Sequence, residues 1–350
     1  MLTFAHLSLA QVCNIFAAGI AIVGRMWRRY KLVILAALGW SFVGVLTKSI
    51  RYDPLPMTSI RSCPYIPLGL LLIARTLFRR QEVTQKKSWA ILDSLAMACR
   101  HVYFSRDGIH WLCAFCSCGS LICMTLAFLN SAGGFATFVN SGSLFLVLLL
   151  SGPVLDHWPT RKEAAIVCLG FIGVCVLAYA GWSRGELSGI LWGATSAGCI
   201  TVALLAQKKR SRGNRGTEAL ESWTLASTIT ALGFAPWMLW TTPPQIPDLL
   251  LIGVLGIFAT FIPDVSYVRA ISGPTGVPLL HAMVVSRISP ILTPVWVCWK
   301  LGEMPSKWSF VGAAIVIVAV FLLAAVQKDD SATEQKLRVS KRGTSQQRKQ

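Results

Sequence analysis

The sequence predicts an all-α integral membrane protein with ten core transmembrane helices arranged as two inverted five-helix repeats. Hydrophobic residues make up 54% of the 350 residues, and charged residues make up 14%. Such a composition would be unusual for a soluble domain and is common in polytopic membrane proteins. The apolar residues also fall into runs close to the ~20 residues that cross ~30 Å of hydrocarbon. An internal repeat and the placement of the basic residues support the same fold class.

The N-terminal segment, residues 1–30, can be explained in two ways. Residues 1–24 are apolar and long enough to span a bilayer, but they lack the basic start of a secretory signal. They are either an extra N-terminal helix or translated sequence upstream of a true start at Met26. The basic residues that follow Met26 suit a cytoplasmic lead-in and favour the second explanation, although the sequence leaves both open.

Ten apolar runs follow, five in each predicted repeat. In the first repeat, residues 31–182, the predicted spans are Leu32–Thr47, Leu55–Ala74, His110–Leu129, Phe135–Leu155 and Ala164–Gly181. In the second repeat, residues 183–326, they are Leu187–Ala206, Leu220–Trp240, Leu249–Val268, Val277–Leu301 and Ser309–Val326. The intervening segment Arg75–Gly108 is too polar to span. Because five is an odd number, the two repeats must have opposite orientations in the bilayer.

The last two spans carry the most specific pattern. Pro290 is followed by an apolar stretch, then by Gly302-Glu303, Pro305 and finally Gly312. This pattern resembles the last two helices of an EamA domain, which belongs to the drug/metabolite transporter superfamily. A degenerate copy lies about 147 positions earlier, where Asp156 stands in the place of Glu303 and Ser143 in the place of Pro290. The resemblance covers about residues 31–326, and internal repeats are a known feature of transporters.

Basic residues provide an independent check on the predicted topology. If both ends of the ten-helix core are cytoplasmic, 26 of the 33 Lys and Arg residues lie in cytoplasmic segments and 5 lie outside. This asymmetry agrees with the positive-inside rule. The net charge of +18 does not indicate nucleic-acid binding, because the charges lie between apolar spans and form no continuous face. The tail, residues 327–350, is basic and polar, and we expect it to be disordered and cytoplasmic.

Polar residues within the spans are the candidate site residues. They are Arg61, Asp264, His281 and Arg287. An arginine at the membrane centre costs at least ~2.5–3.5 kcal/mol on insertion scales, so it needs a partner or a wet cavity. At 1.5 Å per residue, Arg287 lies roughly 20 Å from the outer end of its span, near the midplane. Asp264 lies near the inner end of its own span and is therefore a poor direct partner.

Two interpretations of Arg287 remain open at this stage. It is either a structural residue that pairs or extends towards an interface, or it receives a carboxylate or phosphate of a substrate, with Arg61 as the second choice. A guanidinium suits the latter role because it stays charged and presents two donors side by side. Trp40 and Trp296 are candidate substrate contacts from the first and ninth spans. Glu303 and Asp156 match the acidic turn position of the family, for which we expect a structural role.

The predicted function is that of a secondary transporter, which moves a small organic metabolite across a membrane by alternating access. A membrane-embedded scaffold or enzyme is the alternative, but the predicted spans show no paired carboxylates, His-rich face or nucleophile with a base, and the sequence has no Walker motif. We expect no cofactor and no metal, and we interpret the cysteines of the third span as packing residues. The expected partners are the metabolite and the lipid bilayer, with a homodimer possible and no nucleic acid. The cell membrane, inner or plasma, is the expected location.

Overall fold

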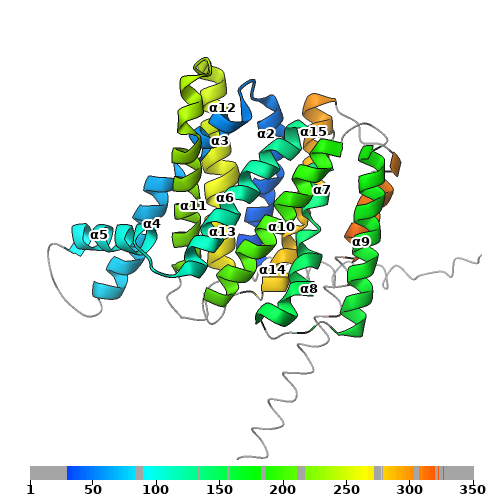
Figure 1. Cartoon of the computed structure of the whole chain (residues 1–350), viewed down its shortest axis with the longest axis horizontal. Helices are drawn as coiled ribbons and strands as arrows, with labels where there is room; N and C mark the ends of the chain where they lie inside the picture. Colours follow the sequence, from blue (N-terminus) through cyan, green and yellow to red (C-terminus); the bar gives the residue numbers. More distant parts are fainter. Residues whose placement is uncertain are drawn as a thin grey trace, which may run out of the picture.

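Helices and the turns between them make up the described part of the computed structural model (Figure 1). The structure describes residues 30–82, 90–131, 135–155, 158, 160–182, 187–210, 217–271, 277, 279–302, 307–308, 310–319, 322 and 326. The N-terminal segment before residue 30 and the tail after residue 326 therefore lie outside the described residues. Both explanations of residues 1–24, an extra helix or sequence upstream of a start at Met26, therefore stay predictions.

The helices of the first half follow the predicted spans, but most spans are divided. A helix over residues 30–41 leads, after a turn at Phe42, into α2. The remaining bounds are α2 (Val43–Ser49), α3 (Pro54–Ser62), α4 (Tyr65–Glu82), α5 (Ala90–Tyr103), α6 (Gly108–Leu129), α7 (Phe135–Asn140), α8 (Ser143–Leu155) and α9 (Arg161–Trp182). Helix α5 belongs to the segment predicted to be too polar to span, and Figure 1 shows it lying across the direction of the bundle helices.

Several predicted spans of the second half are also divided into shorter helices. Its bounds are α10 (Leu187–Arg210), α11 (Glu218–Phe234), the 3₁₀ helix η2 (Ala235–Leu239), α12 (Ile246–Gly256), the π-helix η3 (Ile257–Phe261), α13 (Ile262–Ile271), α14 (Leu279–Ser286) and α15 (Ile288–Leu301). A shorter apolar helix over Phe310–Ala319 follows.

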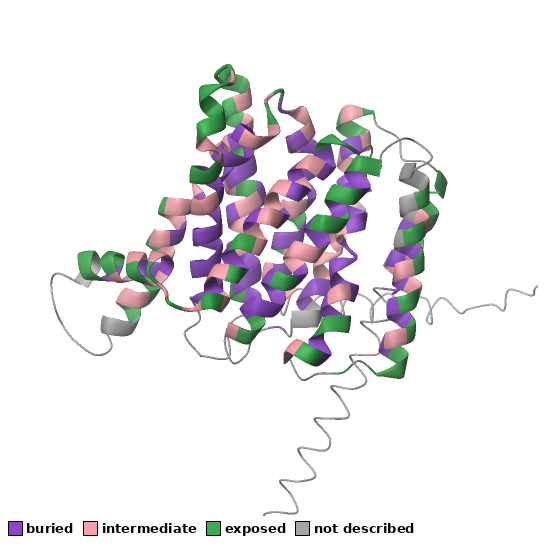
Figure 2. Ribbon diagram, in the orientation of Figure 1, coloured by how far each residue is buried: buried purple, intermediate pink, exposed green. Residues whose placement is uncertain are grey.

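Six helical stretches are long and apolar enough to cross a membrane. They are Tyr30–Ser49, Pro54–Arg79, Gly108–Leu129, Phe135–Val154, Leu187–Arg210 and Ile246–Ile271. Buried residues gather on the helix faces turned towards the middle of the bundle, and exposed residues lie on the outer faces (Figure 2). Large apolar side chains such as Leu71, Leu232 and Phe258 are at least 60% exposed, as lipid-facing positions require. The chain is thus an all-α, multi-pass membrane protein, and the count of ten spans stays a prediction.

Helices α6 and α10 pack closely and join the two predicted repeats. A Cβ atom on Gly189 would lie 2.5 Å from the backbone oxygen of Asn130, so only glycine fits there. Glycine at position 189 thus allows α10 to approach the C-terminal end of α6 closely. Farther along the same contact, the hydroxyls of Ser120 and Ser196 lie 3.0 Å apart, and the fully buried Cys113 directs its thiol to the carbonyl oxygen of Ala203.

The fourth and ninth predicted spans are both interrupted. The fourth breaks between α7 and α8, just after Asn140, and the ninth breaks at Arg287, between α14 and α15. Proline explains the second break: Pro290 has no N–H to donate to the carbonyl of Ser286, so the helix cannot continue regularly there. Asn140 and Arg287 are 147 positions apart, the offset of the internal repeat. The two breaks thus occupy corresponding places in the two repeats.

Candidate functional site

A cavity of about 260 Å³ lies inside the bundle, between helices of both predicted repeats. This volume is close to the lower end of small-molecule sites in proteins. Three charged residues line it: Arg61 from α3, Asp264 from α13 and Arg287 from the break between α14 and α15. Trp40, Tyr65 and Tyr267 supply aromatic wall. Arg61, Asp264, Arg287 and Trp40 are candidates predicted from the sequence, and the structure brings these four together.

Arg61 contacts the π-helical part of the eighth predicted span, Leu249–Val268. The side chain of Arg61 is buried, and its Nε donates a hydrogen bond of 2.9 Å to Oγ1 of Thr260. Thr260 belongs to the π-helix η3 and donates in turn to the carbonyl oxygen of Leu255. Backbone contact is equally close, because a Cβ on Gly256 would lie 2.5 Å from the backbone oxygen of Arg61. The π-helix thus fixes the position of this arginine, in keeping with the frequent occurrence of π-bulges at functional sites.

Asp264 is bound to the first span. The indole Nε1 of Trp40 donates a hydrogen bond of 2.9 Å to Oδ1 of Asp264, and the rings of Trp40 and Tyr267 lie 5.3 Å apart. The ion pairs found within 4.0 Å among the described residues both involve Arg210, so neither arginine of the cavity pairs with Asp264 at that distance. The charges of Asp264 and Arg61 still attract one another across the cavity.

Arg287 has few partners for a charged side chain at membrane depth. One Nη donates a hydrogen bond of 3.2 Å to Oγ of Ser143, the residue that begins α8. Its Nε is buried and has no hydrogen-bond partner among the described residues. A buried charged donor without a partner is expensive, so its presence in a cavity needs a reason. A negatively charged ligand that enters the cavity would provide one.

Other polar atoms in the cavity wall share this lack of a described partner. They are Oη of Tyr65, Oγ of Ser117, Oδ1 of Asn140 and Nε1 of Trp223. Together with Nε of Arg287 they account for five of the eight such atoms in the described part of the chain. Because native proteins rarely bury polar atoms unpaired, this concentration marks the cavity as a place for polar occupants, solute or water.

The remaining nominated residues lie elsewhere. Trp296 does not line the cavity; it donates from Nε1 to Oγ of Ser41 at 3.0 Å and stacks on Phe42. His281 lies within α14, and its side chain is outside the described part of the structure. Pro290 lines the cavity wall, while Gly312 packs against Gly173. Asp156 and Glu303, the acidic turn positions, fall outside the described residues.

Several cavity residues had not been singled out from the sequence. Tyr65, Tyr267 and Thr260 are ordinary members of apolar runs, and no local pattern separates them from packing residues. Asn140 had a usable signal, since it stands at the repeat position equivalent to Arg287.

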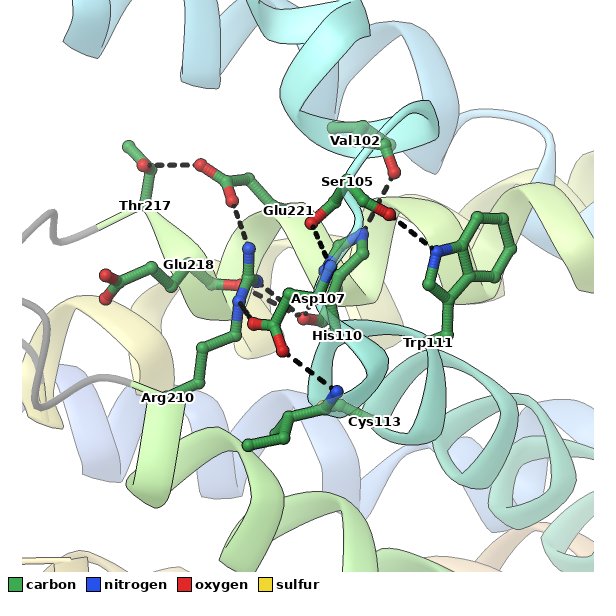
Figure 3. Close-up of polar contacts among 12 residues, drawn as sticks. Val102, Ser105, Asp107, His110, Trp111, Cys113, Arg210, Thr217, Glu218 and Glu221 are labelled. Atoms are coloured by element: carbon green, nitrogen blue, oxygen red, sulfur yellow. Dashed lines mark hydrogen bonds and ion pairs between the residues drawn. The ribbon is translucent and has the colours of Figure 1, made fainter.

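A second charged cluster lies away from the cavity, where α6, α10 and α11 meet (Figure 3). Arg210, the last residue of α10, donates to Oδ2 of Asp107 at 3.0 Å and to Oε2 of Glu221 at 2.8 Å. It also donates to the carbonyl oxygen of Glu218 and to Oγ of Ser222. The charge of this arginine is therefore fully compensated by the protein itself.

The comparisons with known proteins agree with this architecture. Residues 187–325 match the sequence model of the EamA-like transporter family. The second half of this chain is therefore similar to that family. The match supports the membership in the drug/metabolite transporter superfamily that the pattern of the last two spans and its earlier copy predicted. The EamA-like half contributes Asp264 and Arg287 to the cavity, whereas Arg61 and Trp40 come from the half before it.

A solved structure described as "Crystal structure of protein" is also similar to this chain. It matches 85% of this chain and 98% of its own length, with a TM-score of 0.56 and 18% sequence identity. At that identity the likeness shows the fold alone. No curated protein matches the chain. Among the described residues, no group of three or more His, Cys, Asp or Glu side chains could hold a metal ion.

Proposed function

We propose that the protein is a secondary transporter, which moves a small organic metabolite bearing a carboxylate or phosphate across the membrane by alternating access. The observation that carries the proposal is Arg287, whose buried Nε lacks a described partner while the side chain lines a cavity between the repeats. Transporters with inverted repeats place their sites at the repeat interface near the midplane, beside interrupted helices. The EamA-like second half supports the same function.

In this proposal Arg287 anchors the anionic group of the metabolite. It is the N-cap residue of α15, a helix of 14 residues, so the positive end of the helix dipole reinforces the guanidinium charge. The aromatic rings of Trp40 and Tyr267 face the apolar part of the solute. Arg61, already bonded to Thr260, adds positive charge from the opposite repeat.

Transport by reconstituted protein tests the proposal. Purified protein in liposomes is loaded with unlabelled anion and assayed for counterflow of a radiolabelled monocarboxylate, a dicarboxylate and a phosphate ester. Counterflow of at least one is expected. Arg287→Lys keeps the charge but loses the paired donors, and should raise the apparent KM about tenfold, since a charge-assisted hydrogen bond contributes ~1.5–3 kcal/mol. Arg287→Gln should impair transport more.

A matched control and a double exchange separate anchoring from a structural role. Arg79→Gln changes an exposed arginine at the end of α4 and should leave transport unaltered. If Arg287 instead stabilises the fold by attraction to Asp264, the combination Arg287→Asp with Asp264→Arg should restore the expression that each single change destroys. Such rescue, or full anion transport by Arg287→Gln at normal expression, would overturn the anchor. No uptake of any probe by intact protein would favour the scaffold or enzyme alternative.

The proposed location of the protein is the inner or plasma membrane of the cell. In the proposed orientation, both ends of the ten-helix core lie in the cytoplasm. Reporter tags inserted after Arg215 and at the C-terminus should therefore be cytoplasmic, and tags near Thr242 and Gly302 should be external. An external C-terminus would contradict the inverted ten-helix arrangement.

A further inference from the structure

Asp264 has no part in the anchoring scheme above, yet it is the one carboxylate among the described residues that line the cavity. It lies in α13, and its Oδ1 accepts the Trp40 hydrogen bond. A carboxylate inside a membrane protein is costly to keep ionised, and such residues often mark proton pathways in transporters. The question is what its charge does when an anion enters.

Groups from three other helices of the bundle interact with Asp264. Trp40 of the first span donates a hydrogen bond to Asp264. The guanidinium of Arg61 in α3 and the phenol of Tyr65 in α4 interact with it electrostatically. Tyr267 follows three residues later in α13 and interacts in turn with Arg287. The described charges of the cavity are thus two arginines and one carboxylate.

We propose that Asp264 is a proton-binding site, and that protonation of its carboxylate is coupled to binding of the anion so that both cross the membrane together. The inference rests on the proposed transport function and names the ion that drives it. When the cavity is empty, the positive charge of Arg61 stabilises the Asp264 carboxylate. An anion held between Arg61 and Arg287 offsets that charge and repels the carboxylate. Asp264 then takes up a proton and becomes a neutral carboxylic acid.

Thermodynamic reciprocity determines the sign of the pH effect. If the anion favours the protonated form of Asp264, then a proton on Asp264 must favour the anion by the same factor. Protonation raises the net charge of the described cavity residues from +1 to +2, which strengthens anion binding. The Trp40 contact tolerates the change, because Oδ1 can keep accepting while the proton binds to Oδ2. The site can therefore load and release a proton without breaking its link to the first span.

The test compares proton-driven uptake with counterflow in liposomes that contain wild-type protein, Asp264→Asn or Asp93→Asn. For wild type, an inward proton gradient should accumulate the anion identified by counterflow, and apparent affinity should tighten roughly tenfold between the high-pH and low-pH limits. Asp264→Asn retains the acceptor for Trp40, so counterflow should persist at a measurable level while the pH dependence and the gradient-driven accumulation disappear. Asp93, an exposed residue of α5, serves as the control, and its variant should respond to pH like wild type.

The outcomes separate this inference from the proposed function. Wild-type counterflow without any response to a proton gradient would overturn proton coupling and leave anion transport standing. Accumulation by Asp264→Asn that still follows the gradient would overturn the role of Asp264. Absence of counterflow in wild type would instead remove the proposed function.

A measurement without variants covers the case in which Asp264→Asn does not fold. Detergent-solubilised wild-type protein in weak buffer, with a pH-indicator dye, should take up protons when the transported anion is added. It should take up none when a neutral analogue of that anion is added. Proton release, or no change on adding the anion, would overturn the proposal.

Discussion

Arg210 and Arg287 are both largely buried arginines at helix junctions, but the protein treats them differently. Arg210 donates to four acceptors, two of them carboxylates, and its side chain is 10% exposed. Arg287 has one described hydrogen bond, to Ser143, and a buried Nε without a partner. Since both side chains have the same chemistry, the difference lies in what the surroundings supply.

This contrast separates a structural charge from a functional one. A buried arginine whose charge is compensated by carboxylates stabilises contacts between helices, and its removal leaves the opposing charges unpaired. A buried arginine with donors left over costs stability in the empty protein and is useful only when a ligand completes the site. The comparison therefore predicts opposite responses: variants at the Arg210 cluster should lose stability, and variants at the cavity should lose activity.

Arg210→Met should have the largest effect on stability. It leaves the carboxylate of Glu221, which is 1% exposed, without its charged partner, and breaking a buried pair costs about 3–5 kcal/mol. The apparent Tm in detergent, followed by fluorescence-detected size exclusion, should fall clearly. Lys208→Met, at an exposed position of the same helix, should not lower it.

A second change tests the reason for that loss. If the stranded charge of Glu221 is responsible, adding Glu221→Gln to Arg210→Met should recover part of the apparent Tm. A double variant as unstable as the single one would show that packing, and not charge, is what Arg210 supplies.

His110→Leu should have a smaller effect in the same cluster. The imidazole is fully buried, with Nε2 donating to the carbonyl oxygen of Val102 at 2.9 Å and Nδ1 lying 3.0 Å from Oγ of Ser222. Leucine leaves the carbonyl oxygen of Val102 without its donor, at a cost of about 1–3 kcal/mol, whereas the hydroxyl of Ser222 keeps its bonds to Arg210 and Glu218. Thermal unfolding measures the change, and His101→Leu on α5 is the control with little expected effect. Equal stability of the His110 variant and wild type would indicate that water replaces the ring.

Arg287→Met should have the smallest effect on stability, within about 0.5 kcal/mol, because a single hydrogen bond is lost and an uncompensated charge is removed at the same time. A slight increase in the apparent Tm is consistent with this account, while anion counterflow should be lost. A drop in Tm as large as that of Arg210→Met would erase the distinction between the two arginines.

Some of this arrangement follows from the sequence alone. Runs of apolar residues and the 26-to-5 distribution of Lys and Arg predict the membrane fold class, because the bilayer penalises charge and unpaired backbone so strongly. Rarity of charge within spans also identified Arg61, Asp264 and Arg287, which do line one cavity. These predictions succeed because they depend on membrane depth, which can be counted along the chain.

Rotation of a helix about its axis is harder to predict. Trp296 lies in the same predicted span as Arg287 but its indole binds Ser41 of the first span, which no local pattern reveals. Arg210 was counted among the cytoplasmic charges, and its compensation depends on Asp107, 103 positions away. Whether a basic residue at a helix end is solvated or paired depends on which distant carboxylates the tertiary packing places beside it.

The π-helix at Ile257–Phe261 determines where the eighth predicted span can lose a residue during evolution. A π turn closes its hydrogen bonds one residue later than an α turn does, so this stretch contains a surplus residue. Loss of one residue here, for example the exposed Phe258, would restore a regular helix while α12 and α13 keep their present orientations. A deletion elsewhere in the span would turn one flank by about 100° relative to the other and carry Asp264 away from Arg61. The eighth predicted span therefore tolerates a deletion within the π-helix, whereas a deletion on either side of it would change the orientation of the cavity residues.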